Sequence, residues 1–123
     1  MGSIILPINP IYVGRILNGT KKYEYRKRLC KKDIDTILIY ETNPVKKIVA
    51  EVEVLGKRKE EKHKLWQDTM SLSGIEEEKY YKYFSKNEHA CAYELGNVTR
   101  YEKAKELSEY GINFYPQSYV YID

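Results

Sequence analysis

The chain has 123 residues, a length that fits one domain with one modest hydrophobic core. Hydrophobic residues make up 42% and charged residues 32% of the chain, a balance that excludes a disordered protein. The net charge of +3 is small, so it permits an acidic partner without requiring one.

Apolar runs stay far below the roughly 20 residues of a membrane span, which argues against a membrane partner. Two cysteines far apart in the chain provide no disulfide framework. We therefore expect a single domain over residues 1–123 that is intracellular and cytoplasmic, with free thiols.

The first third of the chain predicts a strand, a helix and a second strand. Residues 4–8 are apolar and precede Asn9, which suits a helix N-cap with Pro10 at the first helical position. Gly19 suits the left-handed residue that ends such a helix. The alternating residues 22–28 then predict a strand.

The rest of the chain predicts more strands around two helical insertions. Further strands are expected at 36–40, 47–55, 89–95 and 118–122. Gly56 and the charged run 57–64 are expected to leave the sheet. Residues 73–76 read S-x-x-E, which predicts a capping box that opens a helix. An apolar stripe at 80, 83 and 84 predicts a core-facing side for this helix.

This order of elements predicts the fold class. Strands separated by helical insertions, without a βαβ rhythm, indicate an α+β domain. Several short strands in so short a chain favour a small closed or nearly closed barrel.

The segment 19–26 contains the most informative pattern. Lys22, Glu24 and Arg26 fall on one face of the expected strand, and Tyr23 and Tyr25 fall on the other. A carboxylate between cations is consistent with a surface ladder of ion pairs, each worth ~0–1 kcal/mol. It is equally consistent with a charged, hydrogen-bonding surface that faces a ligand. The residue types leave both interpretations open.

Lys21 and Glu24 are three residues apart, so on a regular strand they would face opposite ways. Both side chains can serve one cleft only if Lys21 lies in the bend before the strand or a bulge intervenes. Arg26 shares the face of Glu24 and can orient the carboxylate through a forked pair.

Residues 21–32 contain seven cations against Glu24 as the single acid. Basic residues interleaved with tyrosines suit phosphate contact together with base stacking. The alternative is a soluble basic edge that keeps a strand from pairing.

A family resemblance rests on four blocks in order. Gly19, Lys21, Glu24 and Arg26 spell G-x-K-x-x-E-x-R, which resembles the signature of the ASCH family (activating-signal-cointegrator homology). Three further blocks resemble the opening strand, the central hairpin and the closing strand of that family, at 5–10, 37–50 and 115–119. The resemblance implies a PUA-like fold, a small mixed β-barrel with flanking helices.

The resemblance also implies a ligand site. In this family the motif lines a cleft beside the barrel for a nucleotide or an RNA base. Lys21 would then face a phosphate or carbonyl group, and Glu24 would accept hydrogen bonds from a base edge. The implied ligand-binding residues are Lys21, Lys22, Glu24, Arg26, Tyr40, Gln117 and Ser118. RNA or a modified nucleoside is the implied partner, and no cofactor is expected.

Two other functions stay open. The chain is similar in layout to small ASCH-fold amidohydrolases that deacylate N4-acetylcytidine, which use a lysine at the position of Lys21. Those enzymes have threonine where this chain has Glu24, and Asp68 lies near the position of their third catalytic group. The catalytic set would then be Lys21, Glu24 and Asp68. The remaining alternative is a protein-interaction module that acts through the tyrosine-bearing helix around 80–84.

A metal site is not predicted. His89 and Cys91 share a strand face, and Cys30 and His63 are the other candidate ligands of these types. Their spacing matches no standard zinc pattern, and Cys91 suits a small buried hydrophobic position.

Overall fold

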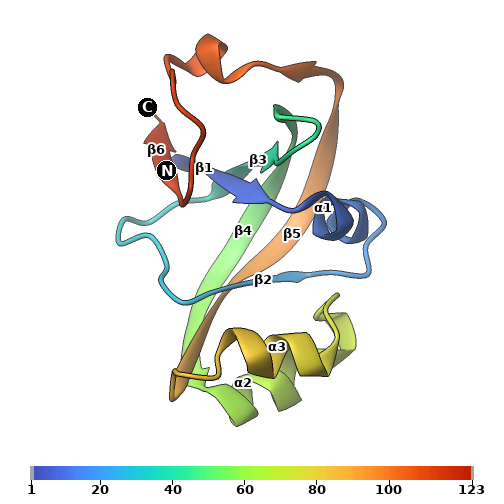
Figure 1. Ribbon diagram of the computed structural model, residues 1–123, viewed down its shortest axis with the longest axis vertical. Coiled ribbons are helices and arrows are strands. Elements are labelled where there is room, and N and C mark those ends of the chain that lie inside the picture. Colours follow the sequence, from blue (N-terminus) through green and yellow to red (C-terminus); the bar gives the residue numbers. More distant parts are fainter. Residues whose placement is uncertain (1, 123) are drawn as a thin grey trace.

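The computed structural model describes residues 2–122 (Figure 1). The strands are β1 (Ser3–Ile8), β2 (Tyr23–Arg26), β3 (Thr36–Glu41), β4 (Lys47–Glu61), β5 (His89–Lys105) and β6 (Val120–Ile122). The helices are α1 (Pro10–Leu17), α2 (Lys62–Thr69) and α3 (Glu77–Tyr83), with short 3₁₀ turns at Met70–Leu72 and Leu107–Tyr110. None of the helices in this range is long and apolar enough to cross a membrane.

All six strands belong to one sheet in the order β2-β5-β4-β3-β1-β6. The β1–β3 pair is parallel and the other pairs are antiparallel. The α+β class is therefore confirmed. The sheet is open, with β2 and β6 at its two edges, so the expected closed barrel is not confirmed. Figure 1 shows β4 and β5 running the length of the molecule, with α2 and α3 gathered at one end.

The long β4–β5 ribbon corrects the expectation that the chain leaves the sheet at Gly56. β4 continues to Glu61, and Gly56 pairs with Glu94 of β5. A Cβ at Gly56 would lie 2.9 Å from Glu94 Oε1, so the missing side chain makes room for this carboxylate. Register shifts on either side of Val54 adjust the pairing nearby. The charged run in β4 lies beyond the pairing with β3, so β4 is here an edge strand next to β5, which pairs with β2 on its other side.

The helix start around Ser73 was also predicted wrongly. α3 begins at Glu77, and the Ser73 hydroxyl donates to the carbonyls of Met70 and Ile75 instead of capping a helix. Gly74 has a positive φ of 62°, which fits a tight turn. The buried turn at Ser73 and Gly74 lies before α3 and contributes to the site described below.

The predicted caps of α1 are confirmed. The Asn9 side chain accepts a hydrogen bond from the Ile11 amide at 3.0 Å, with Pro10 at the first helical position. Gly19 has a φ of 86°, the left-handed conformation expected after the helix. The chain therefore reverses at a defined point between α1 and β2.

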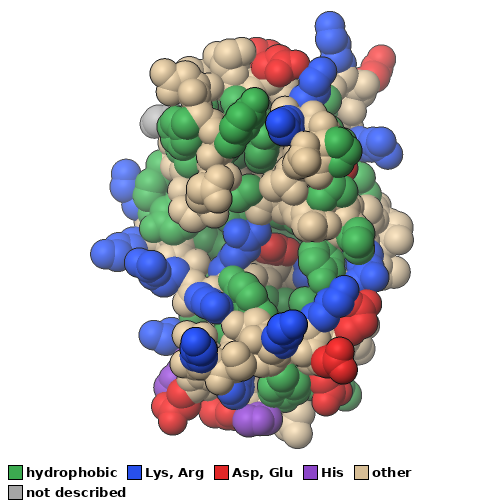
Figure 2. Space-filling model, viewed as in Figure 1, with side chains coloured by type: hydrophobic (Ala, Val, Ile, Leu, Met, Phe, Trp, Pro, Cys, Tyr) green, Lys and Arg blue, Asp and Glu red, His purple; other side chains and the backbone are tan. Residues whose placement is uncertain are grey.

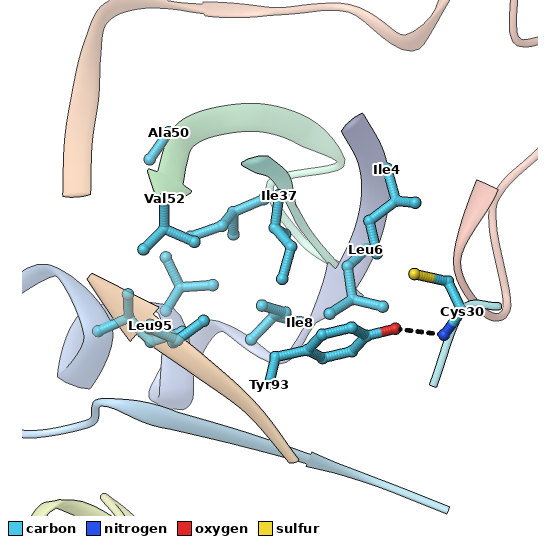
Figure 3. Close-up of a cluster of buried hydrophobic side chains, with 12 residues drawn as sticks. Ile4, Leu6, Ile8, Cys30, Ile37, Ala50, Val52, Tyr93 and Leu95 are labelled. Carbon is cyan, nitrogen blue, oxygen red and sulfur yellow. Dashed lines mark hydrogen bonds between the residues drawn. The ribbon is translucent and has the colours of Figure 1, made fainter. Parts of the chain in front are cut away.

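The centre of the sheet is buried on both faces. Figure 3 shows the larger cluster, to which β1 contributes Ile4, Leu6 and Ile8. Ile5 lies on the other face in a separate cluster with Tyr40. Burial on both faces explains the near-continuous apolar runs of β1 and β3.

The basic loop between β2 and β3 is fastened to the sheet by three side chains. The Tyr93 hydroxyl accepts a hydrogen bond from the Cys30 amide at 2.9 Å (Figure 3). The Tyr121 hydroxyl accepts one from the Lys32 amide at 3.0 Å. Lys57 Nζ donates to the carbonyls of Cys30 and Lys32 at 2.6 and 2.7 Å. The position of this loop is therefore set by the sheet.

Tyr93→Phe is expected to lower the free energy of unfolding by about 1–3 kcal/mol, because it leaves the buried Cys30 amide without its partner. Tyr121→Phe is the matched control, since the amide that it frees is exposed to water. We expect the control to cost less than about 0.5 kcal/mol in urea unfolding. Equal losses in the two variants would contradict the structural role of Tyr93.

Candidate functional site

A hollow of about 310 Å³ lies against β2, between α1 and α3. Its lining residues are Tyr12, Lys21, Glu24, Tyr25, Arg26, Ile75, Lys79 and Tyr83. We call it the lysine hollow. Figure 2 shows basic and acidic side chains next to one another near the centre of this face, with further Lys and Arg side chains around them.

Lys21 lies in the bend before β2, as the spacing to Glu24 required. β2 starts at Tyr23, so the side chains of Lys21 and Glu24 reach the same hollow. Lys21 is 3% exposed, and its Nζ donates to the Ser73 carbonyl at 2.9 Å. The same Nζ lies 3.8 Å from Glu24 Oε1. The expectation that a bend reconciles the three-residue spacing is therefore confirmed.

Two tyrosine rings flank the Lys21 ammonium. Its Nζ lies 5.2 Å from the ring centre of Tyr12 and 5.0 Å from that of Tyr25, within the range of cation–π attraction. Burial raises the pKa of Tyr25 to about 12, and its hydroxyl lies 2.6 Å from the Thr69 hydroxyl. The Tyr25 hydroxyl therefore stays protonated at neutral pH.

The pKa of Lys21 lies below the ordinary lysine value of 10.5. Burial is the main cause, because it disfavours the charged ammonium. Glu24 opposes this shift, whereas the nearby Arg26 and Arg15 guanidinium groups add to it. Because its pKa is lowered, Lys21 loses its proton at a lower pH than a surface lysine does.

Arg26 orients Glu24, as predicted, but both of its hydrogen bonds to the carboxylate go to the same oxygen. Glu24 is 7% exposed, and its Oε2 accepts from Arg26 Nε at 3.1 Å and from Nη2 at 2.9 Å. Arg26 Nη2 also donates to the Pro7 carbonyl, which ties the pair to β1. Both arginine donors converge on Oε2, so Oε1 keeps capacity to accept a hydrogen bond from a ligand.

The turn before α3 packs directly on the Lys21 stem. A Cβ at Gly74 would lie 2.3 Å from Lys21 Cβ and 2.9 Å from Lys21 Cα. Arg15 Nη1 donates to the Gly74 carbonyl at 2.9 Å and also pairs with Glu76 at 3.1 Å. These contacts fix the turn against α1 and hold the Ser73 carbonyl at the ammonium.

A second hollow of about 450 Å³ adjoins the first. Its lining residues are Leu6, Arg26, Lys27, Arg28, Tyr83, Gln117, Ser118 and Tyr119, and we call it the basic hollow. Arg26 and Tyr83 line both hollows. The structure therefore brings Gln117 and Ser118 beside Arg26, in the neighbouring hollow and not at Lys21.

Three of the expected site residues lie elsewhere. Lys22 is exposed and lines neither hollow. Tyr40 is buried in the cluster on the other face of the sheet, because it shares the side of β3 that carries Leu38. Asp68 lies on α2 and lines neither hollow. Its carboxylate pairs with Arg58 of β4 at 2.8 Å and with Lys64 of α2 at 2.9 Å. The structure does not bring Asp68 together with Lys21.

Sequence reasoning missed Tyr83 and Tyr12 as lining residues. Tyr83 was assigned to the buried stripe of its helix, but it is 39% exposed and lines both hollows. Tyr80 and Phe84, one helical turn apart, form the buried side of α3. The interaction-module alternative therefore finds no exposed surface on these two residues. The sequence did contain a signal for this. Residues four apart lie on the same side of a helix, so a buried side formed by Tyr80 and Phe84 turns Tyr83 in a different direction.

Comparison with known proteins identifies the family. The ASCH domain profile matches residues 6–120. The chain belongs to the ASCH domain family. The family assignment made from the four sequence blocks is thereby confirmed.

Solved structures of an ASCH protein share the fold. The crystal structure of ASCH from Zymomonas mobilis is 22% identical and has a TM-score of 0.90, covering 99% of this chain and 88% of that one. A tyrosine-to-phenylalanine mutant of the same protein is 21% identical with a TM-score of 0.90, covering 100% and 91%. At these identities the likeness shows the fold.

A curated relative gives a match to part of a longer protein. ATP synthase subunit alpha of Ureaplasma parvum serovar 3 is 26% identical over 121 residues. The match covers 98% of this chain, but the chain spans only 15% of the length of that relative. The likeness to this ASCH chain therefore concerns a small part of the longer protein.

Gly74→Ala is expected to displace Lys21 and to lower the free energy of unfolding by at least about 2 kcal/mol, from overpacking added to backbone strain. Gly111→Ala is the control, because Gly111 also has a positive φ of 74° but nothing within 4 Å of the added Cβ. The control is expected to cost about 1 kcal/mol from strain alone. Equal losses in urea unfolding would contradict the contact with Lys21.

The stability contributed by Lys21 is expected to rise with pH. Its folded-state pKa lies below 10.5, so between these two values the unfolded chain binds more protons at this residue. The free energy of unfolding of the wild type should therefore increase relative to Lys21→Met in a pH series that runs from neutral pH toward 10.5, the ordinary lysine value. Denaturant titrations across this range measure the difference, and a difference independent of pH would contradict the lowered pKa.

Proposed function

We propose that this ASCH domain binds RNA or a nucleoside in the lysine hollow, with the buried Lys21–Glu24 pair as its floor. The observation that carries the proposal is this pair, 3.8 Å apart and nearly buried at the base of a hollow. Buried charges are costly for folding, and titratable groups with perturbed pKa values concentrate at functional sites.

Each lining group has a role in this proposal. Lys21 Nζ donates to a carbonyl or phosphate oxygen of the ligand, and Glu24 Oε1 accepts from an amino or imino group of a base edge. Arg26 keeps the carboxylate oriented through its two bonds to Oε2. The rings of Tyr12 and Tyr83 offer apolar faces on which a base can pack.

The experiment is a binding screen of modified nucleosides and short RNAs against the wild type and Glu24→Gln. We expect Glu24→Gln to bind a nucleoside or RNA found in the screen about tenfold more weakly than the wild type does, or weaker still, because the charged acceptor is lost. RNA binding should also weaken as salt rises, since phosphate contacts release counterions.

Glu60→Gln is the matched control for this screen. Glu60 pairs with Arg58 at 3.0 Å, the same two-residue spacing as Glu24 and Arg26, but it lies outside both hollows. We expect this variant to bind as the wild type does. The proposal fails if no nucleoside or RNA binds, or if the two variants lose affinity equally.

A second candidate function is deacylation of N4-acetylcytidine-type nucleosides. The lowered pKa of Lys21 favours it, because a neutral amine is the form that attacks an acyl carbonyl. Attack would break the acyl bond to N4 of the cytidine. Glu24, 3.8 Å away, would carry the proton from the lysine to the leaving N4 amine, and water would then release the acetyl group as acetate. Release of cytidine from N4-acetylcytidine by the wild type, and its loss in Lys21→Ala, would support the enzyme. Binding without release would support the binding function alone.

A further inference from the structure

The lysine hollow opens beside a second hollow of different chemistry. The two share Arg26 and Tyr83 as common lining residues, and their volumes are about 310 and 450 Å³. A ligand that fills the first hollow therefore has a neighbouring space beside it, at Arg26 and Tyr83.

In the basic hollow, Lys27 and Arg28 carry positive charge that no acidic side chain of the described residues pairs with. Its lining holds Arg26, Lys27 and Arg28 and includes no carboxylate. Across residues 2–122, none of the ion pairs involves Lys27 or Arg28. Arg26 is paired with Glu24, but Lys27 and Arg28 are two cations without an acidic partner at a concave surface, and such a surface favours an anion.

Lys27 and Arg26 are held at this hollow by specific contacts. The Lys27 amide donates to the Tyr83 hydroxyl at 3.3 Å, and Lys27 Nζ lies 4.9 Å from the Tyr83 ring centre. Arg26 uses Nε and Nη2 for Glu24 and Pro7, so within residues 2–122 its Nη1 has no hydrogen bond. On the other side, Gln117 and Ser118 add neutral polar groups suited to anion oxygens.

We infer that the ligand is a phosphorylated nucleotide unit, with its base in the lysine hollow and its phosphate in the basic hollow. This inference rests on the proposed function and specifies its ligand class. The lysine hollow offers a donor, an acceptor and aromatic rings, which suit a base. The basic hollow offers guanidinium and ammonium groups, which suit a phosphate. A free nucleotide and an RNA strand both supply this chemistry.

The test compares the four ordinary ribonucleosides with their 5′- and 3′-monophosphates and with a short single-stranded RNA, by calorimetry at low salt. A monophosphate is expected to bind about tenfold more tightly than its own nucleoside, from charge-assisted contacts to the phosphate. If RNA is the natural source, the strand should bind more tightly still than any mononucleotide.

A charge-matched pair of double variants locates the effect. Lys27→Gln/Arg28→Gln should remove the tenfold gain, so that a monophosphate binds this variant no more tightly than its own nucleoside does. Arg100→Gln/Lys103→Gln removes the same two kinds of charge from exposed positions on β5, outside both hollows, and should leave the gain intact. Equal losses in the two double variants would overturn the inference, because the attraction would then be diffuse.

The outcomes separate the inference from the proposed function. Nucleoside binding that needs Glu24 but gains nothing from phosphate overturns the inference and leaves the proposed function standing. Absence of binding by every nucleoside, nucleotide and RNA overturns both.

Discussion

The buried contact between Lys21 and Glu24 is the feature on which the site depends. Both side chains are nearly buried, and each has a partner: the Ser73 carbonyl, 52 residues away in the chain, for the ammonium, and the neighbouring Arg26 guanidinium for the carboxylate. Removing either charge from water is costly, so the pair persists only because these partners offset part of that cost. Keeping these two charges at the base of a hollow therefore lowers the stability of the fold.

The architecture explains how the hollow is kept open. β2 is an edge strand, so its outer side is not covered by another strand of the sheet. α1 and the turn before α3 approach this side and are tied together through Arg15 and the Gly74 carbonyl. The loop after β2 is fastened to the sheet by Tyr93 and leaves its cations beside Arg26. One strand thus supplies the floor of the lysine hollow and leads into the basic hollow.

The sequence predicted features that depend on local chemistry. The caps of α1, the alternation of β2 and the need for a bend at Lys21 all follow from neighbours in the chain, and the structure agrees. It did not predict the contact of Lys21 with the Ser73 turn, because 52 residues separate them. The extension of β4 past Gly56 was also missed, since the charged residues of this edge strand have the composition of a loop.

The most direct measurement of the central claim is a crystal structure of the protein with the tightest-binding nucleotide or RNA from the screens. The account predicts a base within hydrogen-bond distance of Lys21 Nζ and Glu24 Oε1, with its ring against Tyr12 or Tyr83. A ligand bound elsewhere, with this pair unchanged and the lysine hollow empty, would contradict it.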